Sequence, residues 1–313
     1  YIGVVGPVRS GKSTFIKKFM DTLVIPNISD EVQKERAIDE LPQSAAGRTI
    51  MTTEPKFIPE DAVEVNVDGA ASFKARMIDC VGYIIPSALG YIEDDQPRMV
   101  KTPWFEDEIP FNMAAEIGTK KVITDHSTIG LVITSDGSIG DIDRAEYEPA
   151  EERVVSELKE INKPFIVLLN STSPNSVPVN CSEIDENEIK RILAELLFEF
   201  PVREIKIDMP RWVGSLEKDH WLRSSVYSCI KNIAKDISKI SEIEKLIQSL
   251  EECEYVSGAE ISEIDLGTGS ARIAVTLDPA LFYKVLGEKT GIEVSDECSL
   301  MQSMMELAKT RQK

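Results

Sequence analysis

Apolar and polar residues follow two periods along the first 200 residues of the chain. Short apolar runs bounded by turn-forming residues predict β-strands. These strands cover Tyr1–Val5, Val63–Val67, Phe73–Ile78, Gly130–Thr134, Phe165–Leu169 and Val177–Asn180. Apolar residues at three- and four-residue steps predict amphipathic helices. These helices cover Lys12–Thr22, Ala114–Asp125, Pro149–Ile161 and Glu186–Glu199. Such alternation is typical of an α/β domain with a largely parallel sheet.

Three connections modify this picture. Asp68-Gly69 predicts a tight hairpin, so the two strands that it joins are expected to pair antiparallel. The stretch Gly82–Pro110 contains four prolines and predicts a long irregular surface segment. Ser171–Ser176 supplies only six residues between the last two strands, whereas a parallel crossover needs a dozen or more. Either those strands are not parallel neighbours or a connecting helix is absent from this chain, and we favour the second interpretation.

The pattern changes after Pro201 and predicts a second, α+β domain. A short strand, Val202–Asp208, precedes a long helical stretch from Leu222 to Glu252. Its apolar stripe fits either a coiled-coil seam or packing onto its own domain, and the small number of heptads favours the latter. Alternating apolar residues around Gly267-Thr268-Gly269 predict a hairpin. Two helices, Pro279–Leu286 and Asp296–Thr310, close this unit, so we divide the chain into domains 1–201 and 202–313.

Composition and charge exclude several classes of protein. The chain is 42% hydrophobic and 28% charged, which is typical of a globular protein, and it has no apolar run of about 18 residues that would span a bilayer. The net charge of −19 repels phosphate backbones, so nucleic acid is not an expected partner. The five cysteines include no Cys-x-x-Cys pair, and we interpret all five as structural or incidental thiols of a reducing compartment.

The clearest chemical motif follows the first strand. Gly6-Pro7-Val8-Arg9-Ser10-Gly11-Lys12-Ser13 fits G-x-x-x-x-G-K-[ST], the P-loop of nucleoside triphosphatases. Its backbone amides are expected to wrap phosphate oxygens, with Lys12 on the β- and γ-phosphates and Ser13 on Mg²⁺. The predicted nucleotide-binding residues of this loop share its backbone or the first turn after it. They are Gly6, Arg9, Ser10, Gly11, Lys12, Ser13 and Thr14.

Two further motifs complete a candidate catalytic set. Asp79-Cys80-Val81-Gly82 matches the D-x-x-G of GTPase-like proteins, in which the Asp holds Mg²⁺ through water and the Gly amide senses the γ-phosphate. Thr52 and Thr53 lie between the first helix and the second strand, where a switch loop is expected, with Thr49 as a reserve. We therefore predict catalytic roles for Lys12, Asp79, Thr52 and Thr53, and metal contacts from Ser13, Thr53 and Asp79.

The base-reading motif differs from that of GTPases. The strand that should end in N-K-x-D ends instead in Asn170-Ser171-Thr172-Ser173, which keeps the Asn and lacks the Lys and the Asp. ATP is therefore the preferred nucleotide, with Asn170 still a predicted contact. Tyr83 follows D-x-x-G where a water-orienting Gln would stand, so hydrolysis is expected to be slow.

These motifs, with several longer strings, resemble the stage IV sporulation protein A family. The resemblance runs through the whole chain and is specific, because the strings are not general features of P-loop proteins. They are Gly6–Lys18, Asp39–Gly47, Thr49–Phe57, Asp79–Tyr83, Thr102–Trp104, Ala114–Thr119, His126–Gly130, Phe198–Pro201 and His220–Arg223.

The resemblance implies a GTPase-like fold that uses ATP and Mg²⁺. Lys12 and Ser13 would be the Walker A residues, Asp79 the Walker B acid, and Thr52 with Thr53 the sensor threonines. It further implies hydrolysis linked to self-assembly into the basement layer of the spore coat, in the mother-cell cytoplasm at the forespore surface.

The implied partners are other copies of the chain, coat morphogenetic proteins and a small amphipathic membrane-anchoring protein. The family's C-terminal region for peripheral membrane contact and polymer contacts is expected to lie outside this sequence, which ends at Lys313. Two alternatives remain open: a GTPase-like regulatory switch, and a structural protein that binds nucleotide without significant turnover.

Overall fold

The chain folds into two compact units, residues 1–200 and 201–313, and each is described by itself. The computed structural model describes residues 1–28, 30–42, 55–67, 71–93, 96–173, 179–265 and 268–311. The predicted boundary between the domains falls between residues 201 and 202.

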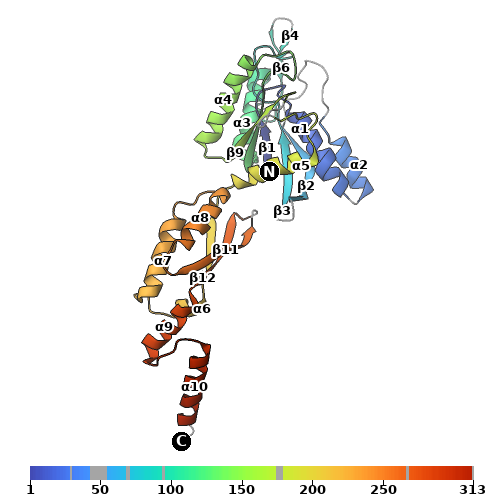
Figure 1. The fold of residues 1–313 in the computed structure, drawn as a ribbon. Coiled ribbons are helices and arrows are strands. Elements are labelled where there is room, and N and C mark those ends of the chain that lie inside the picture. The colour runs from blue at the N-terminus through green and yellow to red at the C-terminus, as the bar shows by residue number, and fades with distance from the viewer. Residues whose placement is uncertain are drawn as a thin grey trace. The chain divides into compact units, whose positions relative to one another are not determined.

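A five-stranded sheet in the order β2-β3-β1-β8-β9 forms the centre of the first unit (Figure 1). β1, β3, β8 and β9 run parallel, whereas β2 pairs antiparallel with β3. The predicted mostly parallel sheet with one antiparallel hairpin is therefore confirmed. The strands are β1 (Ile2–Val5), β2 (Lys56–Val67), β3 (Ala71–Asp79), β8 (Ile129–Ser135) and β9 (Phe165–Asn170).

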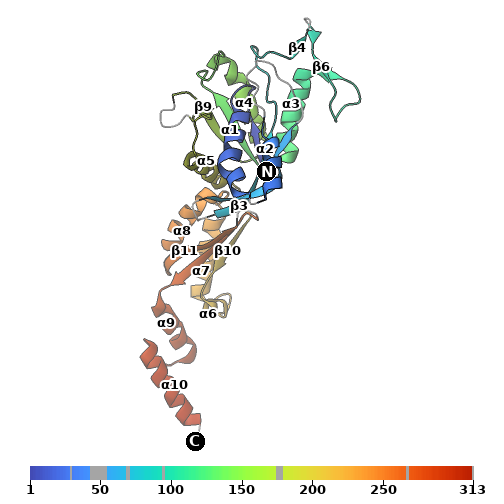
Figure 2. The ribbon, with the colours of Figure 1, turned by 90° about the vertical axis from the view of Figure 1, so that its right-hand side faces the viewer.

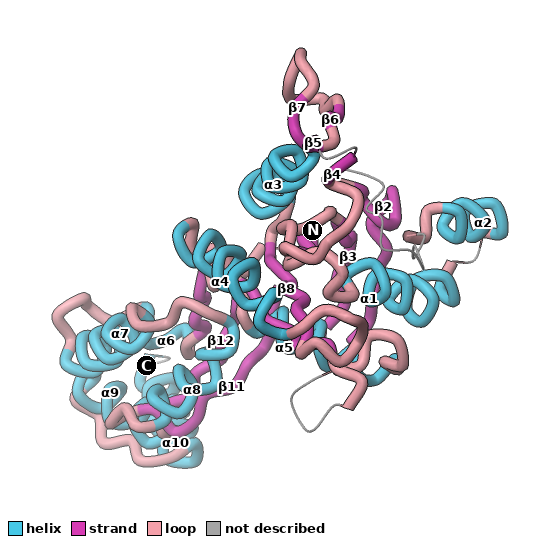
Figure 3. Tube along the Cα trace, turned by 90° about the horizontal axis from the view of Figure 1, so that it is seen from above, coloured by secondary structure: helices cyan, strands magenta, loops and turns pink. Residues whose placement is uncertain are grey.

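Helices cover both faces of this sheet, as Figure 3 shows from above. Side chains of α1 and α5 pack with Val4 in one apolar cluster, and α4 packs with Val5 in a second cluster on the opposite face. Successive residues of a strand point to opposite faces, so β1 contributes to both cores and is completely buried. The helices are α1 (Lys12–Phe19), η1 (Met20–Val24), η2 (Ile25–Asn27), α2 (Glu31–Asp39), α3 (Phe111–Lys121), η3 (Val122–His126), α4 (Arg144–Glu160) and α5 (Glu186–Phe198).

Three predictions for this unit need correction. α2 was not predicted. Only its Ala37 is buried, so the helix lacks the periodic apolar face by which an amphipathic helix is found in a sequence. α4 begins at Arg144 and carries Pro149 inside it, because buried Tyr147 fixes the turn before the proline. The strand predicted at Val177–Asn180 is reduced, among its described residues, to a parallel bridge between Val179 and Asn170.

The segment between Gly82 and Pro110 has local order. Two pairs of very short antiparallel strands form in it, where one long irregular segment was predicted. Their bounds are β4 (Ile92–Glu93), β5 (Gln96–Pro97), β6 (Met99–Val100) and β7 (Ile109–Pro110).

The second unit is built on a three-stranded sheet in the order β10-β12-β11. β10 (Glu204–Asp208) lies parallel to β12 (Ser270–Leu277), and β11 (Val256–Asp265) pairs antiparallel with β12 as the predicted hairpin. α7 and α8 lie side by side along the sheet, whereas α10 extends away from it (Figure 2). The helices of this unit are α6 (Arg211–Gly214), α7 (Trp221–Ala234), η4 (Ile240–Glu242), α8 (Ile243–Glu251), α9 (Pro279–Thr290) and α10 (Glu297–Arg311).

The single long helix predicted from Leu222 to Glu252 was wrong. The chain leaves the helix after Ala234 and restarts at η4, where the Glu242 carboxylate accepts hydrogen bonds from the backbone amides of Ser238 and Lys239. The apolar stripe continues across this break because both helices pack on the same sheet. Ile243 and its stripe therefore face their own domain, and the coiled-coil alternative is not needed.

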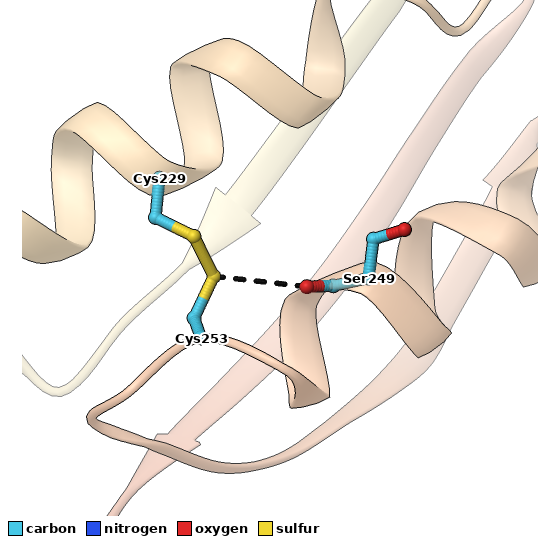
Figure 4. The surroundings of a disulfide bond; sticks show 3 residues. All are labelled: Cys229, Ser249 and Cys253. Carbon is cyan, nitrogen blue, oxygen red and sulfur yellow. Dashed lines mark hydrogen bonds between the residues drawn. A yellow bond between two sulfur atoms is a disulfide. The ribbon is translucent and has the colours of Figure 1, made fainter.

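A disulfide bond between Cys229 and Cys253 joins α7 to the residues that follow α8 (Figure 4). The two Cα atoms are 6.5 Å apart, within the range that a disulfide spans. The interpretation of all five cysteines as thiols was therefore wrong for this pair. Neighbouring helices bring the two residues together, which sequence spacing alone does not reveal. Cys80 and Cys181 are buried thiols, and Cys298 is exposed.

The described helices include none with the length and apolarity that crossing a membrane requires.

Candidate functional site

The candidate site lies at the carboxyl edge of the five-stranded sheet. Because β1, β3, β8 and β9 are parallel, their carboxyl ends share one edge, and open α/β sheets bind ligands at that edge. The Gly6–Ser13 loop follows β1, Asp79 ends β3, and Asn170 ends β9. The topology therefore gathers three motifs that are far apart in the sequence.

The Gly6–Ser13 loop leads directly into the amino terminus of α1. Gly11 occupies the N-cap position with φ of +98°, and it offers no side-chain acceptor to the first amides of the helix. An uncapped helix start carries partial positive charge and free N–H donors, which favour a bound anion. The geometry suits the phosphate cradle that the motif predicts.

Lys12 supplies the cation of the loop. Its side chain is buried, and its Nζ donates a hydrogen bond of 2.6 Å to the carbonyl oxygen of Pro7. Burial lowers the pKa of Lys12, while the neighbouring Cys80 and Asp79 act in the opposite direction. A bound phosphate would place negative charge beside this ammonium, so anion binding would favour the charged form of Lys12.

Asp79 and Ser13 form the polar pair of the site. Val4 of β1 lies in register with Asp79 of β3, which places the carboxylate beside the loop. The Ser13 hydroxyl donates a hydrogen bond of 2.9 Å to Oδ2 of Asp79. Oδ1 of the same carboxylate is buried and finds no hydrogen-bond partner among the described residues. Burial raises the pKa of Asp79, opposed by Lys12 and by the bond from Ser13.

Gly82 lies against the opening of the loop. Its φ of +92° requires glycine, and an added Cβ would lie 2.2 Å from the carbonyl oxygen of Gly6 and 2.7 Å from Nζ of Lys12. Two hydrogen bonds attach the next residue to the loop: Tyr83 N to Gly6 O at 3.1 Å, and Val8 N to Tyr83 O at 2.9 Å. The D-x-x-G segment and the predicted P-loop are therefore in direct contact.

Cys80, inside the D-x-x-G segment, has a buried thiol. Burial raises its pKa to about 11, with Lys12 opposing the shift. The thiol remains protonated near neutral pH and packs as an apolar group, so we assign it no chemistry.

Asn170 braces the loop from the adjacent strand end. Its Nδ2 donates a hydrogen bond of 3.0 Å to the carbonyl oxygen of Ser10, and its Oδ1 accepts a hydrogen bond of 3.0 Å from the amide of Cys181. A Cβ on Gly11 would approach Nδ2 of Asn170 to 2.2 Å, so the two residues fit without spare room. Both ends of the side-chain amide are engaged by protein backbone, and its contact with a nucleotide stays a prediction.

The other predicted residues are placed as follows. Arg9 is exposed at the tip of the loop with φ of +61°. The buried hydroxyl of Ser10 finds no hydrogen-bond partner among the described residues, and Thr14 is half-buried in α1. Thr49, Thr52 and Thr53 lie outside the described residues, so their predicted roles stay predictions.

Helix α4 contributes contacts that sequence reasoning missed. The hydroxyl of Tyr147 donates a hydrogen bond of 3.4 Å to the carbonyl oxygen of Arg9, and Glu157 accepts a hydrogen bond from the hydroxyl of Tyr83. Arg153 lies over the ring of Tyr83, 4.4 Å from its centroid. The one signal in the sequence was the spacing of Arg153 and Glu157, which predicts a helical ion pair and says nothing of Tyr83.

The donor set is suited to Mg²⁺ held together with a nucleotide. Mg²⁺ prefers oxygen ligands and commonly takes one or two protein groups plus phosphate oxygens and waters. The Ser13 hydroxyl and the orphaned Oδ1 of Asp79 are such oxygens. Within the part of the chain that the structure describes, no cluster of three His, Cys, Asp or Glu side chains offers a metal cage independent of nucleotide.

Comparison with known proteins places these features in a family. The family model described as stage IV sporulation protein A, ATPase domain, matches residues 1–177, and the model of its middle domain matches residues 202–313. Proteins named stage IV sporulation protein A from Clostridioides difficile and Bacillus subtilis are each 46% identical to the chain. The matches cover 99% and 98% of this chain, and 67% and 66% of those proteins. The chain thus spans about two thirds of their length.

Proposed function

The chain belongs to the stage IV sporulation protein A family, and from this premise we propose that it is a Mg²⁺-dependent ATPase that builds a static scaffold. The observation that carries the proposal is the hydrogen bond between Ser13, the last residue of the Gly6–Ser13 loop, and Asp79. A buried carboxylate oxygen that has no hydrogen-bond partner among the described residues, next to a buried lysine and a helix amino terminus, is suited to a cation and a polyphosphate together. Membership in a family with an ATPase domain points to the same chemistry.

In this proposal each site residue has its own role in the transfer of the γ-phosphoryl group to water. Backbone amides of the loop and Lys12 would hold the β- and γ-phosphates, and Ser13 and Asp79 would hold Mg²⁺, which supplies positive charge to the phosphate oxygens when bound. The Gly82 amide would meet the γ-phosphate, while Thr52 or Thr53 would orient the attacking water. The fold is then GTPase-like, as the D-x-x-G segment implies.

ATP is the proposed nucleotide because the base-reading segment lacks the groups that select guanine. After Asn170, Ser171 stands in place of the Lys and Ser173 in place of the Asp, so no carboxylate is there to accept from a guanine ring. The Asn170 side chain bonds the backbone of Ser10 and Cys181, which supports a bracing role in the loop.

For the whole protein, we propose that hydrolysis drives self-assembly into the basement layer of the spore coat. This places it in the mother-cell cytoplasm at the forespore surface, with coat morphogenetic proteins and a small amphipathic anchoring protein as partners. The support is the family resemblance and the relatives' sporulation name.

ATP and GTP hydrolysis measured side by side tests this function. The wild-type chain should hydrolyse ATP in preference to GTP and lose turnover when Mg²⁺ is chelated. Lys12→Ala and Asp79→Ala should each lower turnover at least about a hundredfold, because each removes charge stabilisation that a dry site makes large. Lys17→Ala, an exposed lysine on the same helix, is the control and should retain activity.

Two results would contradict the proposal in different ways. A clear preference for GTP would favour a GTPase-like switch. Normal assembly of the Lys12→Ala and Asp79→Ala variants without nucleotide would favour a structural protein that merely binds nucleotide.

A further inference from the structure

Tyr83 is held from two sides. Its backbone bonds Gly6 and Val8 of the loop, at 3.1 and 2.9 Å, while its side chain packs among buried residues and bonds Glu157 of α4. The residue is 2% exposed and packs in the apolar cluster between the sheet and α4. A residue at this position that oriented water would need its side chain in the site, so Tyr83 does not act in that way.

The side chain ends in a charged cluster shared by two helices. Its hydroxyl donates to Oε2 of Glu157 on α4, and Arg153 stacks over its ring at 4.4 Å. The same guanidinium bonds Oε2 of Glu116 on α3 at 2.9 Å and Oε1 of Glu157 at 3.3 Å. Tyr83 is thus fixed to α3 and α4 through a network in which its hydroxyl is the only neutral donor among these four side chains.

This anchoring determines where Gly82 lies. Gly82 has no side chain to hold it in place. Glycine can adopt several backbone conformations besides the observed one, in which φ is +92°. The residue after it is fixed by backbone bonds on one side and by the Glu157 hydrogen bond on the other. The Cα of Gly82 therefore stays so close to the carbonyl oxygen of Gly6, beside Lys12 Nζ, that no Cβ would fit there.

We infer that Tyr83 is a positioning residue that sets Gly82 for contact with a γ-phosphate, and so makes the site discriminate a triphosphate from a diphosphate. This inference rests on the proposed nucleotide site and deepens it. In the proposed site the phosphates that ATP and ADP share would lie on the loop, whereas only the γ-phosphate would reach Gly82. Loosening Tyr83 should therefore weaken triphosphate binding selectively. Burial and the Glu157 carboxylate both raise the pKa of Tyr83, which keeps its hydroxyl a donor at neutral pH.

The test is the affinity of the full chain for ADP and for a non-hydrolysable ATP analogue, each with Mg²⁺, measured by calorimetry. Tyr83→Phe removes the hydroxyl and keeps the ring. We expect it to weaken analogue binding about tenfold, the size of one hydrogen bond to a charged group, and to leave ADP binding within about twofold. Glu157→Gln removes the charge from the other partner and should give the same selective loss. It is the variant to use if Tyr83→Phe does not fold.

A double-mutant cycle and a control complete the design. The two substitutions combined should cost no more than either alone, because they act through one bond. Glu152→Gln, an exposed carboxylate on the same helix, should change neither affinity. Equal losses for ADP and the analogue, or no loss for either, would overturn the inference. Failure of the wild-type chain to bind either nucleotide would instead overturn the proposed function.

Discussion

Gly11 and Asn170 show how closely single residues are fitted at the phosphate loop. Nδ2 of Asn170 occupies the space beside the Gly11 Cα and bonds the preceding carbonyl, so the strand end of β9 supports the turn into α1. The motif demands glycine here for two independent reasons: a left-handed backbone and a side chain from another strand. Only the first reason can be stated from the motif.

Gly11→Ala should therefore damage the site. The left-handed backbone and the 2.2 Å approach to Asn170 together are expected to cost about 1–3 kcal/mol of folding free energy and to weaken nucleotide binding at least about tenfold. Thermal unfolding and calorimetric titration measure the two effects. Gly140→Ala is the matched control, since a Cβ there meets nothing within 4 Å. Equal tolerance of both substitutions would show that the loop relaxes around Asn170.

At the scale of elements, α4 is the helix that connects the site to the rest of the first unit. It contacts the loop tip through Tyr147 and, through Glu157, the tyrosine that follows the D-x-x-G segment. Glu146 in its first turn accepts from the amide of Ser87 at 2.8 Å. Its amphipathic period predicted a helix, but the start at Arg144 depends on the burial of Tyr147. Boundaries of this kind are decided by packing, which the local sequence does not contain.

The disulfide between Cys229 and Cys253 is the strongest link between elements of the second unit. It closes a segment of 24 residues that includes the helix break before η4. By loop-closure entropy, replacing both cysteines with serine should lower the unfolding free energy of this unit by about 3 kcal/mol. Denaturant unfolding in the absence of reductant measures the change. Cys298→Ser, which removes an exposed thiol, should leave stability unchanged, and a loss equal to that of the double variant would contradict the prediction.

At the scale of the whole molecule, the described site residues and the disulfide belong to different compact units. The described nucleotide-site residues all fall in residues 1–200, whereas Cys229 and Cys253 fall in residues 201–313. Each unit has its own sheet and buried side chains, as expected of domains able to fold separately.

Ligand and reductant should therefore act on separate thermal transitions. A non-hydrolysable ATP analogue with Mg²⁺, at about 100 times its Kd, should stabilise the first unit by about 2.7 kcal/mol and raise only its transition. Reductant should lower only the transition of the second unit. Scanning calorimetry of the full chain resolves the two, and fragment 1–200 serves as the reference for the first. One transition that responds to both agents would show that the units unfold together.

The sequence by itself determined the five strands of the first unit's sheet, its helices other than α2, and the central motifs, because hydrophobic period and the spacing of Gly6–Ser13 and Asp79–Gly82 are local properties. It identified Asp79 correctly as the end of a strand beside that loop, since parallel strands must share a carboxyl edge. Only the tertiary structure decided which distant groups meet: Glu157 with Tyr83, Asn170 with Gly11, and Cys229 with Cys253. Such contacts depend on how helices and strand ends pack in three dimensions, and no spacing along the chain records that.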